Sequence, residues 1–168
     1  MKSIFKLLFA AFLTVAPLTA NAQSNVAHIN VQQLISEMPE VIAAQNELAK
    51  LEKDYTTQID NAFKEFQTKD QSYSSDAANQ TDVTNQARQK ELESMQTNLQ
   101  EFRDSAAQEL QKKQMDLMTP LLEKARNAIT KVGEEQGFNY VIDSSPNGGI
   151  ILANGKDLLA DVKKELGF

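Results

Sequence analysis

Cysteine and tryptophan are absent from the chain of 168 residues, which holds one histidine, six glycines and four prolines. Without cysteine the protein can form no disulfide, and it offers neither a thiolate nucleophile nor a thiolate ligand for a metal. A single histidine, His28, excludes every site that needs two imidazoles. Because glycine and proline are scarce, turns are few, and we expect long regular elements.

Basic charge is also limited, at 17 Lys and Arg against 23 Asp and Glu, a net charge of −6. Nucleic-acid binding needs clustered positive charge to neutralise phosphates, so we expect no nucleic-acid partner. The sequence lacks a glycine-rich phosphate loop, a G-x-S-x-G elbow and an HExxH pair. We therefore expect that the protein is not an enzyme and has no catalytic residue, no cofactor and no metal site.

The first 22 residues have the pattern of a secretory signal. Lys2 and Lys6 precede the apolar run 7–13, and Ala-Asn-Ala at 20–22 is the small-x-small pattern of a cleavage site. The apolar run is shorter than the roughly 20 residues that cross a bilayer. We expect cleavage after Ala22, export of the mature chain, and no stable membrane insertion.

Apolar residues recur every three or four positions along the middle of the chain, which is the spacing of a coiled-coil seam. The first run is Val41, Ala44, Leu48, Leu51, Tyr55, Ile59, Ala62 and Phe66. The second run is Leu92, Met95, Leu99, Phe102, Ala106, Leu110, Leu117, Leu121, Ala125, Ile129 and Val132. This pattern predicts two long helices that pack against each other.

The polar segment between the runs predicts that the two helices form a hairpin. Residues 72–82 are rich in Ser, Asp and Asn, which favour turns. An antiparallel hairpin over 39–132, with its turn near 74–82, places residues whose numbers add to about 158 opposite each other. Phe66 then faces Leu92. Pro120 lies inside the second helix, where we expect a bend.

The two ends of the chain predict a small β unit. The expected elements are strands at 25–30, 138–143 and 149–153, a short helix at 31–38, and a last helix at 158–166 capped by Asp157. We expect segments 23–38 and 133–168 to form one β-rich body. Since three short strands and a small helix bury little apolar surface, we expect a homo-oligomer, a dimer or a trimer, whose copies contribute strands to one barrel or sandwich.

The fold class is thus α+β and mainly α: a long antiparallel coiled-coil hairpin on a small β body that oligomerises into a shared barrel. Several features then match a known family in order. They are the signal peptide, Val26–Asn30 before a short helix, the Gln-, Lys- and Glu-rich coiled coil, Leu117–Lys124, Gly137–Asp143, and Asp157–Val162. In these features the mature chain resembles the Skp/OmpH family of periplasmic chaperones.

The resemblance implies a homotrimer whose hairpins form three tentacles around a cavity. The family holds unfolded outer-membrane β-barrel proteins there without ATP and prevents their aggregation. Leu159 and Ala160 replace the Thr-Asp of the family's terminal motif. Well-known members have strongly basic tentacles, whereas residues 40–132 here contain 12 basic and 16 acidic side chains. We therefore carry over no lipopolysaccharide site.

Candidate contacts for an unfolded client are apolar residues near the end of the hairpin. They are Phe63, Phe66, Tyr73, Val83 and Met95. Phe63, Phe66 and Met95 also fit packing within the hairpin seam. The alternative function is an envelope scaffold, in which the coiled coil binds specific folded partners.

Overall fold

The computed structural model describes residues 25–168, and the expected signal peptide at 1–22 lies outside this range. The elements in chain order are β1 (Val26–Ile29), α2 (Val31–Glu37), α3 (Pro39–Asp76), the 3₁₀ turn η1 (Ala77–Asn79), α4 (Asp82–Glu135), β2 (Tyr140–Asp143), β3 (Lys156–Asp157) and α5 (Leu159–Leu166). The described chain is mainly helical, as the sequence predicts.

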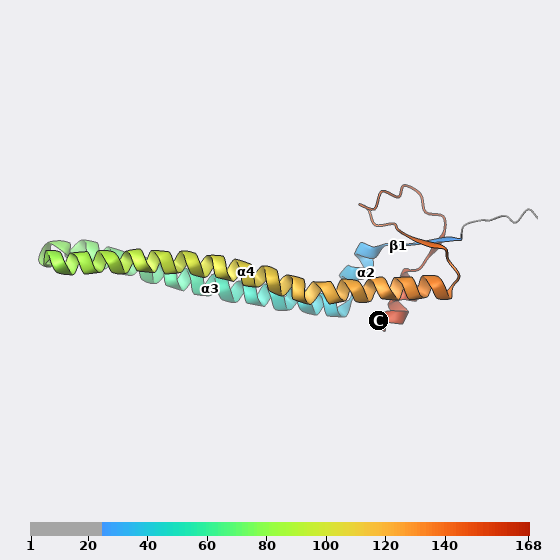
Figure 1. Cartoon of the computed structure of the whole chain (residues 1–168), viewed down its shortest axis with the longest axis horizontal. Helices are drawn as coiled ribbons and strands as arrows, with labels where there is room; N and C mark the ends of the chain where they lie inside the picture. The colour runs from blue at the N-terminus through green and yellow to red at the C-terminus, as the bar shows by residue number, and fades with distance from the viewer. Residues whose placement is uncertain (1–24) are drawn as a thin grey trace, which may run out of the picture.

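Helices α3 and α4 form a long antiparallel arm that extends from a small body (Figure 1). At 1.5 Å per residue, the 38 residues of α3 reach about 57 Å. The 54 residues of α4 reach farther, because its last turns run on beneath the sheet of the body. The predicted helical hairpin is confirmed.

Local chemistry sets where the arm helices begin. Met38 has an extended backbone, and Pro39 occupies the first turn of α3, where its missing N–H costs no helical hydrogen bond. At the far end, Thr81 caps α4 by accepting a hydrogen bond from the backbone N–H of Thr84 at 3.2 Å. The chain reverses between these helices at residues 77–81. Helix α4 then continues through Pro120.

The body contains a three-stranded parallel sheet in the order β2-β1-β3. The strand predicted at 149–153 is wrong, because that segment lies in a loop that extends away from the sheet. Its sequence Ile150-Ile151-Leu152 favours a strand, but a strand forms only where a neighbouring edge supplies hydrogen bonds. Within one chain β3 takes the place beside β1 instead, at Lys156–Asp157.

The hydrophobic core lies where the sheet packs on the base of the arm. Its buried members are Ala27, Ile29, Leu34, Met38, Val41, Ala125, Ala128, Val132, Leu158 and Val162. Gly133 allows α4 to approach β2 closely, because a Cβ there would stand 2.8 Å from Cγ2 of Val141 and would force one of the two to shift. Helix α5 closes the core from the other side and ends at Gly167, whose φ is +89°.

Candidate functional site

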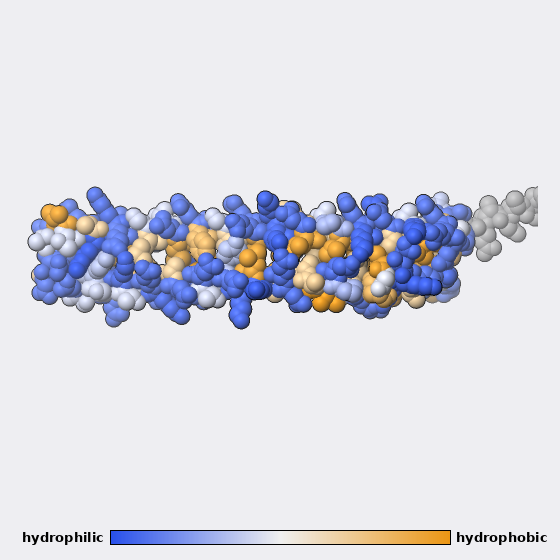
Figure 2. Space-filling view, turned by 90° about the horizontal axis from the view of Figure 1, so that it is seen from below, coloured by the Kyte–Doolittle hydropathy of each residue, from blue (hydrophilic) through white to orange (hydrophobic). Residues whose placement is uncertain are grey.

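The arm has almost no core of its own. Between residues 45 and 124 only Leu99 and Ala106 are buried. In Figure 2 the apolar side chains follow the line between the two helices, polar side chains cover both flanks, and openings pass through the arm. Such an arm exposes most of its surface to solvent and any bound molecule.

Polar and aromatic contacts join α3 to α4 at several levels. From base to tip they are Glu40–Lys124 (2.5 Å), Glu47–Lys113 (2.8 Å), Tyr55–Glu109, the edge-on rings of Tyr55 and Phe102 (6.0 Å between centroids), Lys69–Glu91, Tyr73–Glu91 (2.7 Å) and Asp76–Arg88 (3.1 Å). The bonded pairs have numbers that add to 160 or 164, and the aromatic pair to 157. The observed register thus lies within a few residues of the predicted one.

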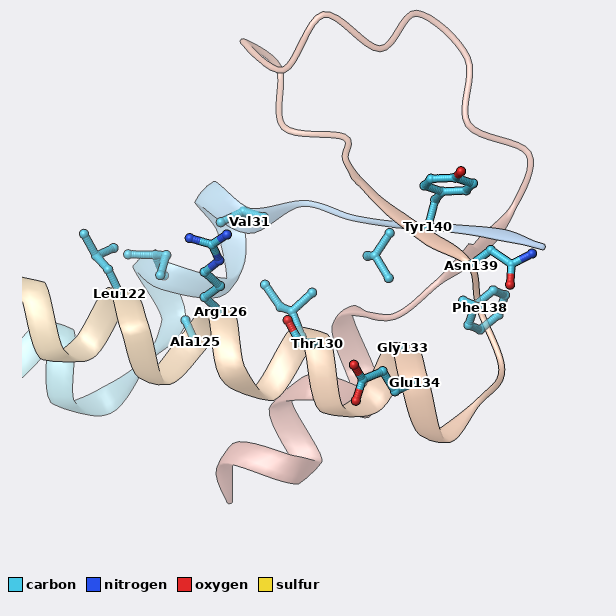
Figure 3. Close-up of a pocket in the computed structure, with 13 residues that line it drawn as sticks. Val31, Leu122, Ala125, Arg126, Thr130, Gly133, Glu134, Phe138, Asn139 and Tyr140 are labelled. Carbon is cyan, nitrogen blue, oxygen red and sulfur yellow. The ribbon is translucent and has the colours of Figure 1, made fainter. Parts of the chain in front are cut away.

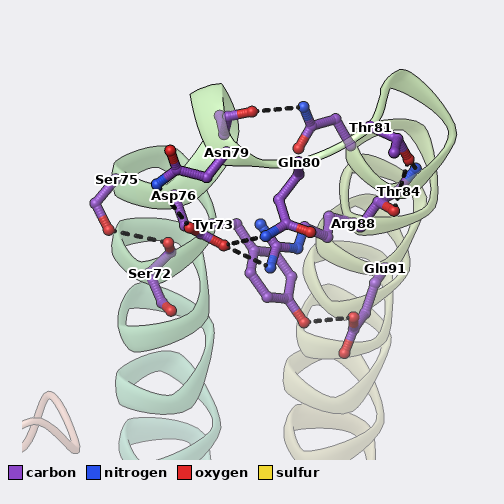
Figure 4. A network of polar contacts seen from close by, with 12 residues as sticks. Ser72, Tyr73, Ser75, Asp76, Asn79, Gln80, Thr81, Thr84, Arg88 and Glu91 are labelled. Carbon is purple, nitrogen blue, oxygen red and sulfur yellow. Dashed lines mark hydrogen bonds and ion pairs between the residues drawn. The ribbon is translucent and has the colours of Figure 1, made fainter.

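The tip is held by a cluster of polar side chains (Figure 4). Tyr73 donates to Glu91, and Arg88 lies over the Tyr73 ring at 4.7 Å while it pairs with Asp76. Hydrogen bonds from Lys69 and then Tyr73 lower the pKa of Glu91, and the same carboxylate raises the pKa of Tyr73. Hydrogen bonds between α3 and α4 are therefore more closely spaced at the tip than elsewhere in the arm.

A groove of about 530 Å³ lies on one side of the seam, in the middle of the arm. On α3 it is lined by Phe63 and Phe66, whose rings stack with centroids 6.5 Å apart. On α4 its lining residues are Glu93, Gln96, Thr97, Leu99, Gln100 and Arg103. An aromatic wall thus faces a largely uncharged polar wall.

The structure separates the five predicted contact residues. Phe63 and Phe66 share the groove, and Met95 is half-buried on α4. Tyr73 belongs to the polar cluster of the tip. Val83, 77% exposed, is the most open apolar side chain of the arm. Sequence reasoning missed Leu99 as a wall of this groove, and only the register of the hairpin could have placed it there.

The body carries a second apolar surface. Side chains alternate across β1 and β2, so that Ala27, Ile29 and Val141 point to the core, while Tyr140 and Ile142 point away from it. Figure 3 shows the Tyr140 ring on the side of β2 opposite to α4. The neighbouring loop exposes Ile151 completely and 75% of Leu152. Within the described chain no helix covers this face.

A second groove of about 530 Å³ runs beside the outer edge of β2 (Figure 3). Helix α4 contributes Leu122 and Ile129 to its apolar lining, and α2 contributes Val31 and Ile35. The edge of β2 faces no other strand of the described chain, since β1 occupies its inner side. The body therefore presents an open strand edge, an apolar groove and an uncovered sheet face.

Residues 25–168 contain no group of His, Asp and Glu side chains arranged to hold a metal ion. None of the helices within them is long and apolar enough to cross a membrane. His28 lies on the central strand, where its Nδ1 is 3.2 Å from Oγ of Ser144.

The model of one protein family, described as outer membrane protein (OmpH-like), matches residues 25–166. This match covers the arm and the body together. The chain belongs to the OmpH-like family. Its members are chaperones and not enzymes.

Two relatives and one solved structure support the assignment. The chain is 28% identical to the chaperone protein Skp of Yersinia enterocolitica, over 96% of this chain and 98% of that protein. It is 20% identical to Skp of Pectobacterium atrosepticum, over 90% of each. The crystal structure of an OmpH-like outer membrane chaperone from Caulobacter crescentus superposes with a TM-score of 0.76 at 12% identity, over 86% of this chain and 85% of that one. This last likeness shows that the fold is shared.

Proposed function

We propose that this OmpH-like protein is a periplasmic holdase that binds unfolded outer-membrane β-barrel proteins between its arms, without ATP, and prevents their aggregation. The observation that carries the proposal is the open arm, in which 80 residues of antiparallel hairpin contain two buried side chains. A surface of this kind offers many weak contacts and no fixed interface, which suits clients without structure.

The uncovered face of the body supports assembly into a homotrimer. Tyr140, Ile142 and the loop residue Ile151 are apolar and open to solvent, and the edge strands β2 and β3 each have one unpaired side. Burial of this face against further copies of the chain, around a shared barrel, removes it from water and pairs the edges. Three arms then stand around one cavity, and contacts with all three add up to useful retention.

The client contacts that we propose on the arms are Phe63, Phe66, Tyr73, Val83 and Met95. Phe63, 40% exposed, and Val83 offer apolar surface directly. Phe66, Tyr73 and Met95 are half-buried and also contribute to the hairpin. The N-terminal pattern at 1–22 supports secretion and release of the mature chain after Ala22.

The test uses an outer-membrane β-barrel protein unfolded in urea. It is diluted into buffer with and without this protein, with no nucleotide, and light scattering records aggregation. We expect full suppression at about one trimer per client. A folded, oligomeric protein that leaves scattering unchanged would overturn the proposal and favour the scaffold, in which the arm binds folded envelope partners.

A further inference from the structure

The middle section of the arm, residues 56–68 of α3 and 92–101 of α4, differs from the parts on either side. Bonds between α3 and α4 involve Tyr55 below this section and Lys69 above it. Among the described residues no hydrogen bond or ion pair joins the two helices within the section itself. It is about 20 Å long at 1.5 Å per residue.

Neighbouring parts of the arm are bonded at much shorter intervals. On α3 the bonded residues toward the base are Glu40, Glu47 and Tyr55, seven or eight residues apart. Toward the tip they are Lys69, Tyr73 and Asp76, three or four residues apart. The middle section therefore lacks the contacts that hold the helices together at both of its ends.

Apolar packing in the middle section is sparse, as it is along the rest of the arm. Leu99 is its one buried side chain, and the groove of about 530 Å³ lies beside it. The Phe63 ring remains 40% exposed above that groove. Local opening costs least where few contacts must be broken, and this section is the longest stretch of the arm without a hydrogen bond or ion pair between α3 and α4 among the described residues.

We propose that this middle section opens and takes uncharged apolar side chains of an unfolded client between α3 and α4. The inference rests on the proposed holdase function and assigns it a binding site within the arm. Opening frees Leu99 and the inner side of Phe66 for the client, while the contacts at tip and base keep the hairpin in register.

The chemistry of the groove selects the occupant. Its two charged lining residues, Glu93 and Arg103, have opposite signs, and its α3 wall is aromatic. An extended, uncharged segment with aromatic or aliphatic side chains complements this lining. Gln96 and Gln100 supply amide groups that can pair with the backbone of such a segment.

Hydrogen exchange of the wild-type protein, followed by mass spectrometry, tests the opening directly. After correction for intrinsic rates, we expect amides of the middle section to exchange about ten times faster than those of residues 40–55 and 69–76. Bound client should slow the middle section selectively. Equal exchange along the whole arm would overturn the inference.

An added ion pair tests whether opening is needed for binding. Moving Lys69 and Glu91 by one heptad along each helix leads to Ala62 and Asn98, which occupy the equivalent level of the seam. We expect Ala62→Lys with Asn98→Glu to slow exchange in the middle section and to weaken client binding about fivefold. The matched control, Ala62→Lys with Asn98→Lys, should do neither.

A covalent link makes the test independent of the strength of that pair. Because the chain has no cysteine, Ala62→Cys with Asn98→Cys can be joined selectively by a bismaleimide. Linked protein that binds an unfolded β-barrel protein as tightly as its unlinked form overturns the inference and leaves the holdase function standing. Wild-type protein that binds no client overturns both.

Discussion

Arg88 lies over the ring of Tyr73, with its Cζ atom 4.7 Å from the ring centroid. Since Tyr73 is on α3 and Arg88 is on α4, this contact joins the two helices across the tip. One terminal nitrogen of Arg88 also pairs with Asp76 at 3.1 Å. The guanidinium therefore connects the last turn of α3 to the first turns of α4 and fixes the point where the chain reverses.

Two substitutions of Tyr73 should distinguish the effect of its hydrogen bond to Glu91 from that of its contact with Arg88. Tyr73→Phe keeps the ring beneath Arg88 and loses the hydrogen bond to Glu91, whereas Tyr73→Ser loses both. Cation–π contacts at exposed sites correspond to about a two- to fivefold change in an equilibrium. We expect amides of residues 77–85 to exchange about two- to fivefold faster in Tyr73→Ser and less so in Tyr73→Phe. Equal exchange in Tyr73→Ser and wild type would show that the ring does not hold the tip.

Acid should loosen the same tip. Hydrogen bonds from Lys69 and Tyr73 depress the pKa of Glu91 in the folded arm, and those from Asn79 and Arg88 depress the pKa of Asp76. A carboxylate whose pKa is lower in the folded than in the unfolded state stabilises the fold at pH values above its unfolded pKa, near 4. This stabilisation is lost as the pH falls through the folded pKa. We therefore expect tip exchange, corrected for intrinsic rates, to rise as the pH falls below about 4.

The variant Lys69→Gln supplies the control for this titration. It removes the first of the two donors to Glu91, so carboxyl NMR should show the Glu91 midpoint closer to the ordinary value. A Glu91 midpoint that is unchanged in Lys69→Gln would contradict the assigned cause.

Periodicity predicted the hairpin because its apolar residues alternate in steps of three and four, a property of each helix alone. It did not predict the partners of Tyr73, since the predicted register differs by a few residues from the observed one, which is enough to change the side chains that meet. The segment Ile150–Leu152 was misassigned for a related reason. Its residues favour a strand, but a strand also needs hydrogen bonds from a neighbouring strand. The loop extends away from the sheet and does not pair with the open sides of β2 or β3 within the described chain.

The exposed loop should govern assembly if the body is shared between copies. Ile151 is fully exposed and makes no packing contact that a charge would break within one chain. We expect Ile151→Asp to reduce the oligomer fraction at least tenfold in analytical ultracentrifugation, because burial of an unpaired carboxylate is costly. Val83→Asp places the same charge on an exposed apolar site of the arm and should leave assembly intact. If Ile151→Asp sediments like the wild-type protein, this loop does not belong to the interface between copies.

Pro120 should lower the stability of the protein, because it interrupts the backbone hydrogen bonding of α4. As a proline inside α4 it cannot donate the backbone hydrogen bond that the helix would otherwise form there. Pro120→Ala restores the donor but makes the unfolded chain less restricted, so we expect a net gain of about 2 kcal/mol in the free energy of unfolding. Urea denaturation measures it. The exposed neighbour Thr119→Ala controls for helix propensity, and an equal gain there would contradict the explanation.

Client binding should depend little on salt. Residues 40–132 contain 16 acidic and 12 basic side chains, so the arm offers no excess of positive charge to attract a client. Apolar contacts are then the main attraction, and these are not screened by ions. The Debye length falls from about 10 Å at 0.1 M salt to about 3 Å at 1 M, which abolishes steering between exposed charges.

Fluorescence titration of a labelled, urea-unfolded β-barrel protein at both salt concentrations measures this dependence. We expect the Kd to change by less than about threefold, since steering by charge contributes little. Phe63→Ser, which removes exposed aromatic surface from the groove, should weaken binding equally at both concentrations. A rise in Kd of tenfold or more at 1 M salt would show that charge, and not the apolar seam of the arm, holds the client.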